Sequence, residues 1–183
     1  LFTLFFKGQF SEIDIDPVVE NEDDFAVDFI LKNMTYRITE FDYECFFLNK
    51  NDRIVEYIIT NCVNLHEEGC FETFSRNESD KAVMWLISNP NYLYLESFMC
   101  NENPIAIDYC ISKIEKGGCN VDKLSTFLKL NKSKKVFDFV YNNSIHLTQS
   151  KKTDRLFRLL SKSPFIFVDD KITYKKRLVE IKK

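Results

Sequence analysis

Turn-forming residues are scarce in this sequence. Its 183 residues include four glycines and four prolines, against eighteen phenylalanines. Strand-rich sandwiches and barrels need frequent Gly- and Pro-containing turns, so the composition disfavours them. With 45% hydrophobic and 29% charged residues, the chain has an ordinary globular composition. The sequence therefore predicts an all-α fold of helices joined by short connections.

The residues that catalytic and metal sites require are also few. The two histidines, His66 and His146, have no recurring nucleophile or carboxylate beside them. The Gly-Gly pair at 117–118 predicts a turn, because no Lys-Ser/Thr follows it to complete a phosphate-binding loop. The acidic cluster of residues 12–24 lacks the glycine and terminal Glu of a calcium loop, so we interpret it as a solvated face. We expect no enzyme, no metal ion and no cofactor.

No hydrophobic run approaches the ~18 residues that span a bilayer. We therefore expect a soluble, cytoplasmic protein with no membrane contact, whose six cysteines, none in a CxxC pair, are mostly buried thiols. A secreted protein with three disulfides is the alternative. It would suit the four Asn-x-Ser/Thr glycosylation motifs at Asn33, Asn77, Asn131 and Asn142.

A three-residue pattern recurs six times along the chain. It reads Asn or Ser, then Glu or Lys, then Asn, Ser or Asp, and the third residues are spaced 24 to 30 positions apart. Such a period is typical of stacked helical repeats. The copies are residues 21–23, 49–51, 77–79, 101–103, 131–133 and 161–163.

Apolar residues follow each copy at helical spacing, with a mostly acidic position on the predicted solvent side. The third residue of the pattern is a predicted N-cap, and Pro104 and Pro164 stand at the following position, where a missing N–H costs nothing. The first residue is predicted to close the preceding helix. The pattern therefore predicts a helix, a three-residue corner and a second helix. The predicted first helices are residues 42–48, 70–76, 96–100, 122–130 and 154–160.

Two further residue types recur with the pattern. One aromatic residue in each of the first five copies is interpreted as core between repeats and not as a base-stacking ladder. Asparagines ten positions after the third corner residue are predicted to end the second helices in a left-handed conformation. The aromatic residues are Phe29, Tyr57, Trp85, Tyr109 and Phe139, and the asparagines are Asn33, Asn61, Asn89 and Asn143.

These features predict a right-handed α-solenoid of about six helix-turn-helix repeats of 24–30 residues. We expect a single repeat domain over residues 1–183. An N-terminal capping helix region would occupy 1–22, the repeats 23–160 and a basic C-terminal cap 161–183.

Residues 49–59 carry a family resemblance. They read Asn-Lys-Asn-Asp-Arg-Ile-Val-Glu-Tyr-Ile-Ile, which is similar to the corner and second helix of divergent ankyrin repeats from AT-rich large DNA viruses and intracellular parasites. The Thr-Pro-Leu-His tetrapeptide and the corner glycine of that family are absent, so a generic paired-helix solenoid without ankyrin hairpins is the alternative. The resemblance implies a non-enzymatic interaction scaffold.

Charge is distributed unevenly along the chain. Residues 1–120 carry 9 basic and 22 acidic residues, a net −13, whereas residues 121–183 carry 16 and 6, a net +10. Clustered cations bind phosphates in a sequence-independent way, although a basic end could also be the solubilising cap of a solenoid. The candidate anion-binding residues are Lys129, Lys132, Lys134, Lys135, Lys151, Lys152, Arg155, Arg158, Lys162, Lys175, Lys176 and Arg177.

Two functional hypotheses follow. The first is a protein-interaction scaffold or adaptor that binds another protein through the corners and connections of its repeats. The second is a regulatory factor of the silencing or hibernation type that docks on RNA, or on a large ribonucleoprotein such as the ribosome, through its basic C-terminal repeats. Neither hypothesis includes a small-molecule substrate.

Overall fold

The computed structural model describes residues 16–33, 43–62, 70–144, 147 and 150–165. Every regular element in these residues is a helix and none is a strand, which confirms the predicted all-α fold. The described residues belong to two compact units that divide between Trp85 and Leu86. None of the described helices is long and apolar enough to cross a membrane.

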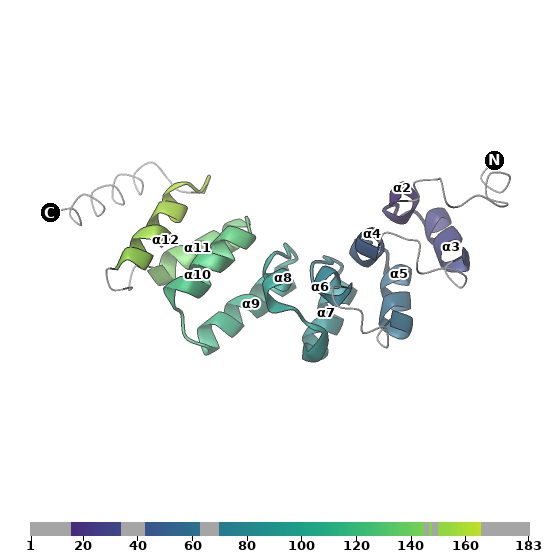
Figure 1. Cartoon of the computed structure of the whole chain (residues 1–183), viewed down its shortest axis with the longest axis horizontal. Helices are drawn as coiled ribbons and strands as arrows, with labels where there is room; N and C mark the ends of the chain where they lie inside the picture. Colours follow the sequence, from purple (N-terminus) through teal and green to yellow (C-terminus); the bar gives the residue numbers. More distant parts are fainter. Residues whose placement is uncertain (1–15, 34–42, 63–69, 145–146, 148–149, 166–183) are drawn as a thin grey trace. The chain divides into compact units, whose positions relative to one another are not determined.

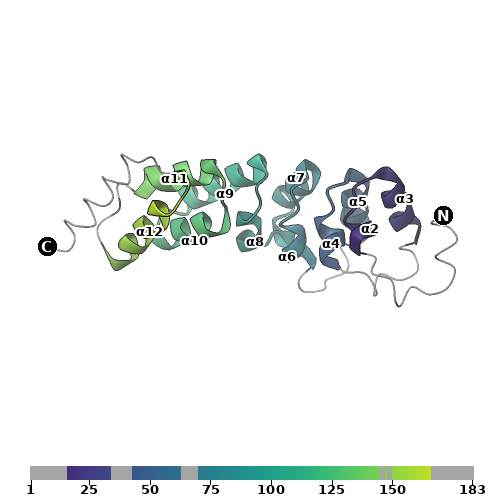
Figure 2. The ribbon, with the colours of Figure 1, turned by 90° about the horizontal axis from the view of Figure 1, so that it is seen from above.

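The N-terminal unit consists of paired helices. In Figures 1 and 2 the first helices of successive pairs, α2, α4 and α6, lie on one side and the second helices, α3, α5 and α7, on the other. Helix α4 packs against α2 and α6, and α3 packs against α5. The helices are α2 (Asp16–Val19), α3 (Asp24–Asn33), α4 (Tyr43–Leu48), α5 (Asp52–Tyr57), its π-helical continuation η3 (Ile58–Cys62), α6 (Cys70–Phe74) and α7 (Asp80–Ser88).

The C-terminal unit repeats this arrangement. The first helices α10 and α12 pack side by side, as do the second helices α9 and α11, and α8 packs on α9 (Figure 2). The elements are the 3₁₀ turn η4 (Pro90–Tyr92), α8 (Leu95–Met99), α9 (Pro104–Lys116), α10 (Val121–Leu130), α11 (Lys134–Ser144) and α12 (Lys151–Ser161). Helix α12 begins three residues before its predicted start because the Oγ of Ser150 accepts the N–H of Thr153 and caps it.

The third residue of the corner caps the following helix, as predicted. The Oδ1 of Asn103 accepts the backbone N–H of Ile105 at 2.8 Å, and Pro104 is the first residue of α9. The Oδ1 of Asn51 accepts the N–H of Arg53 at 3.0 Å. Asp23, Ser79 and Ser133 accept in the same way. The side-chain oxygen thereby satisfies an N–H group that the first helical turn leaves without a partner.

The predicted apolar rhythm describes the buried face of the second helices. The third and fourth residues after each cap are buried, and so is the seventh, as Ile54, Val55 and Ile58 show in α5 and η3. The fifth residue lies on the solvent side, and Glu56 is exposed there. Helices this short gain their stability from such tertiary packing rather than from propensity.

The recurring aromatic residues make ring contacts within a helix pair, and their role between repeats stays a prediction. Four of these half-buried rings each meet a buried phenylalanine on the first helix of the same pair. Ring centroids are 5.8–6.5 Å apart for Phe46–Tyr57, Phe74–Trp85, Phe98–Tyr109 and Phe127–Phe139. The tight corner brings these residues together, because they lie 11 or 12 positions apart on either side of it.

The prediction for the recurring asparagines is wrong. No described residue other than glycine has a positive φ. Instead, the Nδ2 groups of Asn61 and Asn143 donate to the carbonyl oxygens of Tyr57 and Phe139, four residues earlier. The side chains of these two asparagines thus bond back to a carbonyl one helical turn earlier. The predicted turn after α9 is present, and Gly118 adopts a φ of 79° there, which favours glycine.

Candidate functional site

The first residue of the corner ties that corner to the one before it. Asn77 is fully buried. Its Nδ2 donates to the carbonyl oxygens of Phe47 (2.8 Å) and Asn49 (2.9 Å), while its Oδ1 accepts the N–H of Ser79 at 2.9 Å. One side chain therefore satisfies two carbonyls of the preceding pair and shapes its own corner.

The same pair of hydrogen bonds from a corner asparagine, here called a rung, recurs elsewhere in each unit. The Nδ2 of Asn49 donates to the carbonyl oxygens of Val19 and Asn21 at 2.7 and 3.3 Å. In the C-terminal unit, the Nδ2 of Asn131 donates to those of Met99 and Asn101 at 3.3 and 2.8 Å. We call these contacts the asparagine ladder.

The ladder explains two of the four glycosylation motifs. Asn77 and Asn131 are buried and hydrogen bonded, so neither amide is accessible to a glycan in this fold. The predicted closure of the preceding helix is also present, since the N–H groups of both residues bond to helix carbonyls. The ladder was not predicted, although its signal was the strict recurrence of Asn as the first corner residue.

The middle residue of each corner projects outward. In the N-terminal unit these residues are Glu22, Lys50 and Glu78, which alternate in sign. The Nζ of Lys50 lies 2.7 Å from the Oε2 of Glu78. This hydrogen bond, together with the attraction of both glutamates, raises the pKa of Lys50. The positive charge of Lys50 is therefore offset by the glutamates of the two neighbouring corners.

Ion pairs join neighbouring second helices, and one of them involves a predicted anion-binding residue, Lys135. Lys135 pairs with Asp108 at 2.5 Å, across α11 and α9. In the N-terminal unit, Arg53 pairs with Asp28 and Lys81 pairs with Glu56. Like Lys135, both cations stand two residues after the third residue of a corner. All these groups are largely exposed, so each pair contributes little to stability.

Two more of the predicted anion-binding lysines have acidic partners. Lys134 pairs with Asp138 at 2.6 Å within α11, and Lys152 pairs with Asp122 at 2.6 Å between α12 and α10. Lys134, Lys135 and Lys152 are thus neutralised locally. The last three predicted residues, Lys175, Lys176 and Arg177, lie outside the described residues.

Six described candidates remain: Lys129 and Lys132 lie at the end of α10 and in the corner after it, and the other four form a stripe along α12 and its C-cap. Lys151, Arg155, Arg158 and Lys162 are spaced by four, three and four residues, which places them on one side of the helix. All four are exposed, and within the described part of the chain none forms an ion pair. We call them the α12 stripe, which is a surface open to an anionic partner.

The asparagine ladder stops at the last described corner. Ser161 stands where the rung would be, and its Oγ donates to the carbonyl oxygen of Arg158 in its own helix. By the register of the ladder, the missing rung would have bonded the carbonyls of Lys129 and Asn131. The Nζ of Lys132 donates to the carbonyl oxygen of Lys129 at 2.7 Å. No described side chain donates to the carbonyl oxygen of Asn131.

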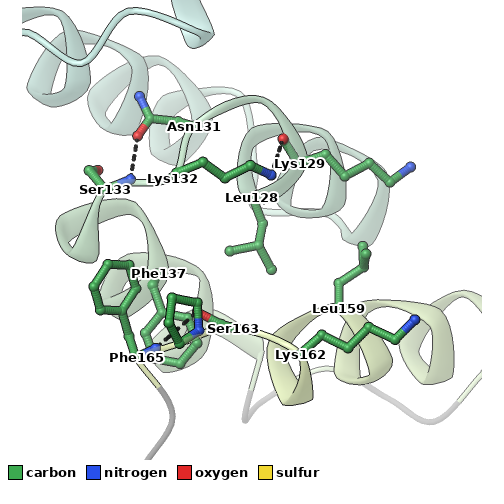
Figure 3. A pocket seen from close by; sticks show the side chains of 11 residues that line it. Leu128, Lys129, Asn131, Lys132, Ser133, Phe137, Leu159, Lys162, Ser163 and Phe165 are labelled. Atoms are coloured by element: carbon green, nitrogen blue, oxygen red, sulfur yellow. Dashed lines mark hydrogen bonds between the residues drawn. The ribbon is translucent and has the colours of Figure 1, made fainter.

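A pocket of about 400 Å³ opens beside this corner. In Figure 3, Leu128 and Leu159 point toward one another across it, and the Lys129 and Lys162 side chains extend on the same side. The lining combines an apolar wall with three lysines and contains no carboxylate. The lining residues are Leu128, Lys129, Asn131, Lys132, Ser133, Phe137, Leu159, Lys162, Ser163, Pro164 and Phe165.

The described cysteines are free thiols, but fewer are buried than predicted. Cys70 and Cys110 are buried, whereas Cys45, Cys100 and Cys119 are half-buried. Burial raises the pKa of Cys110 to about 12, so this thiol stays protonated and unreactive at neutral pH.

Among residues 16–33, 43–62, 70–144, 147 and 150–165, no three His, Cys, Asp or Glu side chains gather as a metal site would require. The corner asparagines and serines are engaged in caps and ladder bonds. Comparison with protein-family models, curated proteins and solved structures found no match for this chain.

Proposed function

We propose that this chain is a non-enzymatic scaffold or adaptor, a right-handed α-solenoid of ankyrin-like repeats that binds another protein. This proposal rests on the different roles of the three residues in each corner. The first and third residues are fixed by caps and ladder bonds, while the middle residue is charged and projects into solvent. The fold can therefore keep its corners while changing the side chain that each one presents.

The C-terminal unit is the better binding surface of the two. In the N-terminal unit, Lys50 is already paired with Glu78. In the C-terminal unit, the corner residues Lys132 and Lys162 are exposed and form no ion pair within the described residues. Unpaired surface charge favours specific association with a partner of opposite charge.

Co-purification from the native cell, with crosslinking and mass spectrometry, tests this proposal. We expect a protein partner crosslinked to the corner lysines of the C-terminal unit, and we expect Lys132→Glu with Lys162→Glu to remove it. Lys116→Glu, an exposed change away from the corners, should leave the partner bound. Recovery of the chain alone, or of the same partner with the double variant, would contradict the proposal.

A second candidate function is association with RNA or a ribonucleoprotein, and the α12 stripe favours it. Its four cations form a positive ridge along one helix, as phosphate backbones require. Reversing Lys151, Arg155 and Arg158 to Glu should abolish binding to bulk RNA, and wild-type binding should fall steeply as salt is raised. Reversal of the paired Lys152 is the control. Absence of RNA binding at low salt would eliminate this candidate.

A further inference from the structure

The pocket lies beside the corner at which the asparagine ladder lacks a rung, and it is lined by Lys129 and Asn131, whose carbonyls that rung would have bonded. At three earlier corners an asparagine amide donates to two carbonyls, as Asn131 does to Met99 and Asn101. At residue 161 a shorter serine turns back to its own helix. Breaks in an otherwise regular structural rule concentrate at functional sites.

A second regular contact is also replaced here. In both units a cation two positions after the corner pairs with an acid of the preceding second helix, as Lys135 does with Asp108. The equivalent of Lys135 in the last repeat is Phe165, whose ring lies 6.0 Å from that of Phe137. Asp138, the equivalent acid, pairs with Lys134 in its own helix instead. This position is therefore apolar at the last corner, as it is at Ile105, whereas Arg53, Lys81 and Lys135 are charged and paired there.

The lining of the pocket defines a complementary ligand. Lys129, Lys132 and Lys162 supply three cations with no acidic residue among the lining side chains. Leu128 and Leu159 supply apolar surface between them (Figure 3). The carbonyl oxygen of Asn131, which receives no side-chain donor from the described residues, calls for an N–H group. A ligand that fits would carry carboxylates, an apolar side chain and an amide.

The aromatic rings argue against a stacked nucleobase in this pocket. The ring of Phe137 is stacked on Tyr141 at 5.9 Å and also contacts Phe165. Binding of single-stranded nucleic acid relies on open aromatic faces for stacking, and here the ring of Phe137 packs against two other rings. The apolar content suits an aliphatic side chain.

We propose that this pocket binds an acidic peptide segment of a partner protein. The segment places an aliphatic side chain between Leu128 and Leu159 and carboxylates at the lysines. It donates an amide N–H to the carbonyl of Asn131, as the missing asparagine would. The inference rests on the proposed scaffold function, because it names the kind of segment that the C-terminal unit recognises.

Fluorescence anisotropy with short labelled peptides tests the inference. The main probe is an Asp- and Glu-rich peptide with one central Leu beside an Asn. The comparison probes replace that Leu by Ser, replace the acidic residues by Lys, or are polyglutamate and a single-stranded oligouridylate. We expect the main probe to bind the full chain, and the Leu→Ser peptide to bind about tenfold more weakly because it lacks the side chain that the pocket buries.

Two variants give the sharpest outcomes. Ser161→Asn restores the rung, so we expect a higher melting temperature together with at least about tenfold weaker peptide binding. Lys129→Glu with Lys162→Glu should weaken binding at least as much, and Lys116→Glu should not. The raised melting temperature of the first variant separates occlusion of the pocket from misfolding.

Several results would overturn the inference. These are absence of binding to the main probe, equal binding of the Leu- and Ser-containing peptides, binding of oligouridylate that equals that of the peptide, and unchanged peptide binding after Ser161→Asn. The proposed function fails separately, since it requires only that a protein partner co-purifies with the chain. A partner that is retained by the native chain while every peptide fails would refute the pocket assignment alone.

Discussion

Replacement of Asn77 by Ala is expected to lower the free energy of unfolding by about 3 to 4 kcal/mol. The substitution leaves the carbonyls of Phe47 and Asn49 and the N–H of Ser79 without their side-chain partner in a fully buried position. A buried polar group that loses its only bonding partner costs about 1–3 kcal/mol. Partial entry of water into the vacated space keeps the total below the sum of three such losses.

Urea unfolding followed by circular dichroism measures this effect. Asn61→Ala is the matched control, because Asn61 is exposed and makes a single described hydrogen bond, to the carbonyl of Tyr57 in its own helix. The control should change stability by less than about 0.5 kcal/mol. Similar losses for the two variants would show that the buried ladder bonds contribute nothing beyond an ordinary helix contact.

Replacement of Phe74 by Ala should cost about 3 to 5 kcal/mol. Phe74 is fully buried, and its ring lies 6.0–6.1 Å from those of Phe47, Phe71 and Trp85. It therefore joins the first helices α4 and α6 to the second helix α7. Truncation removes its buried apolar area and leaves a cavity among rings that can only partly close around it.

The intrinsic fluorescence of Trp85 reports on this change directly. Trp85 is the only tryptophan, and its ring stacks on Phe71 at 6.1 Å. We expect a shifted emission maximum and a lower urea midpoint for the Phe74 variant. Phe25→Ala is the control in the same unit, and since Phe25 is 67% exposed it should cost less than about 1 kcal/mol. Equal urea midpoints for the two variants would argue against a core at Phe74.

Contacts between near neighbours in the chain were predictable from the sequence. The Oδ1 of Asn51 caps an N–H two residues later, so the cap is a property of a few consecutive residues. The burial of Ile54 and Val55 followed from helical spacing in the same way. Contact partners were not predictable in this way: the sequence did not show that Tyr57 meets Phe46 of its own pair.

At the candidate site, too, the residue types were predictable from the sequence and their contact partners were not. The sequence identified the cations of residues 129–162, but it could not separate Lys135, which Asp108 neutralises, from Lys162, which has no such partner in the described residues. Sequence also gave no sign of the pocket, although Ser161 in place of Asn was visible as a departure from the pattern.

The sequence by itself determined the helical class, the corner caps and the excess of cations toward the C-terminus, because these depend on composition and on bonds between near neighbours. Only the tertiary structure decided which corner asparagines join the ladder, which lysines stay unpaired and where the pocket opens. Those outcomes depend on groups about thirty residues apart, such as Asn131 and Asn101, and only the packing of one helix pair on the next brings them within hydrogen-bonding distance.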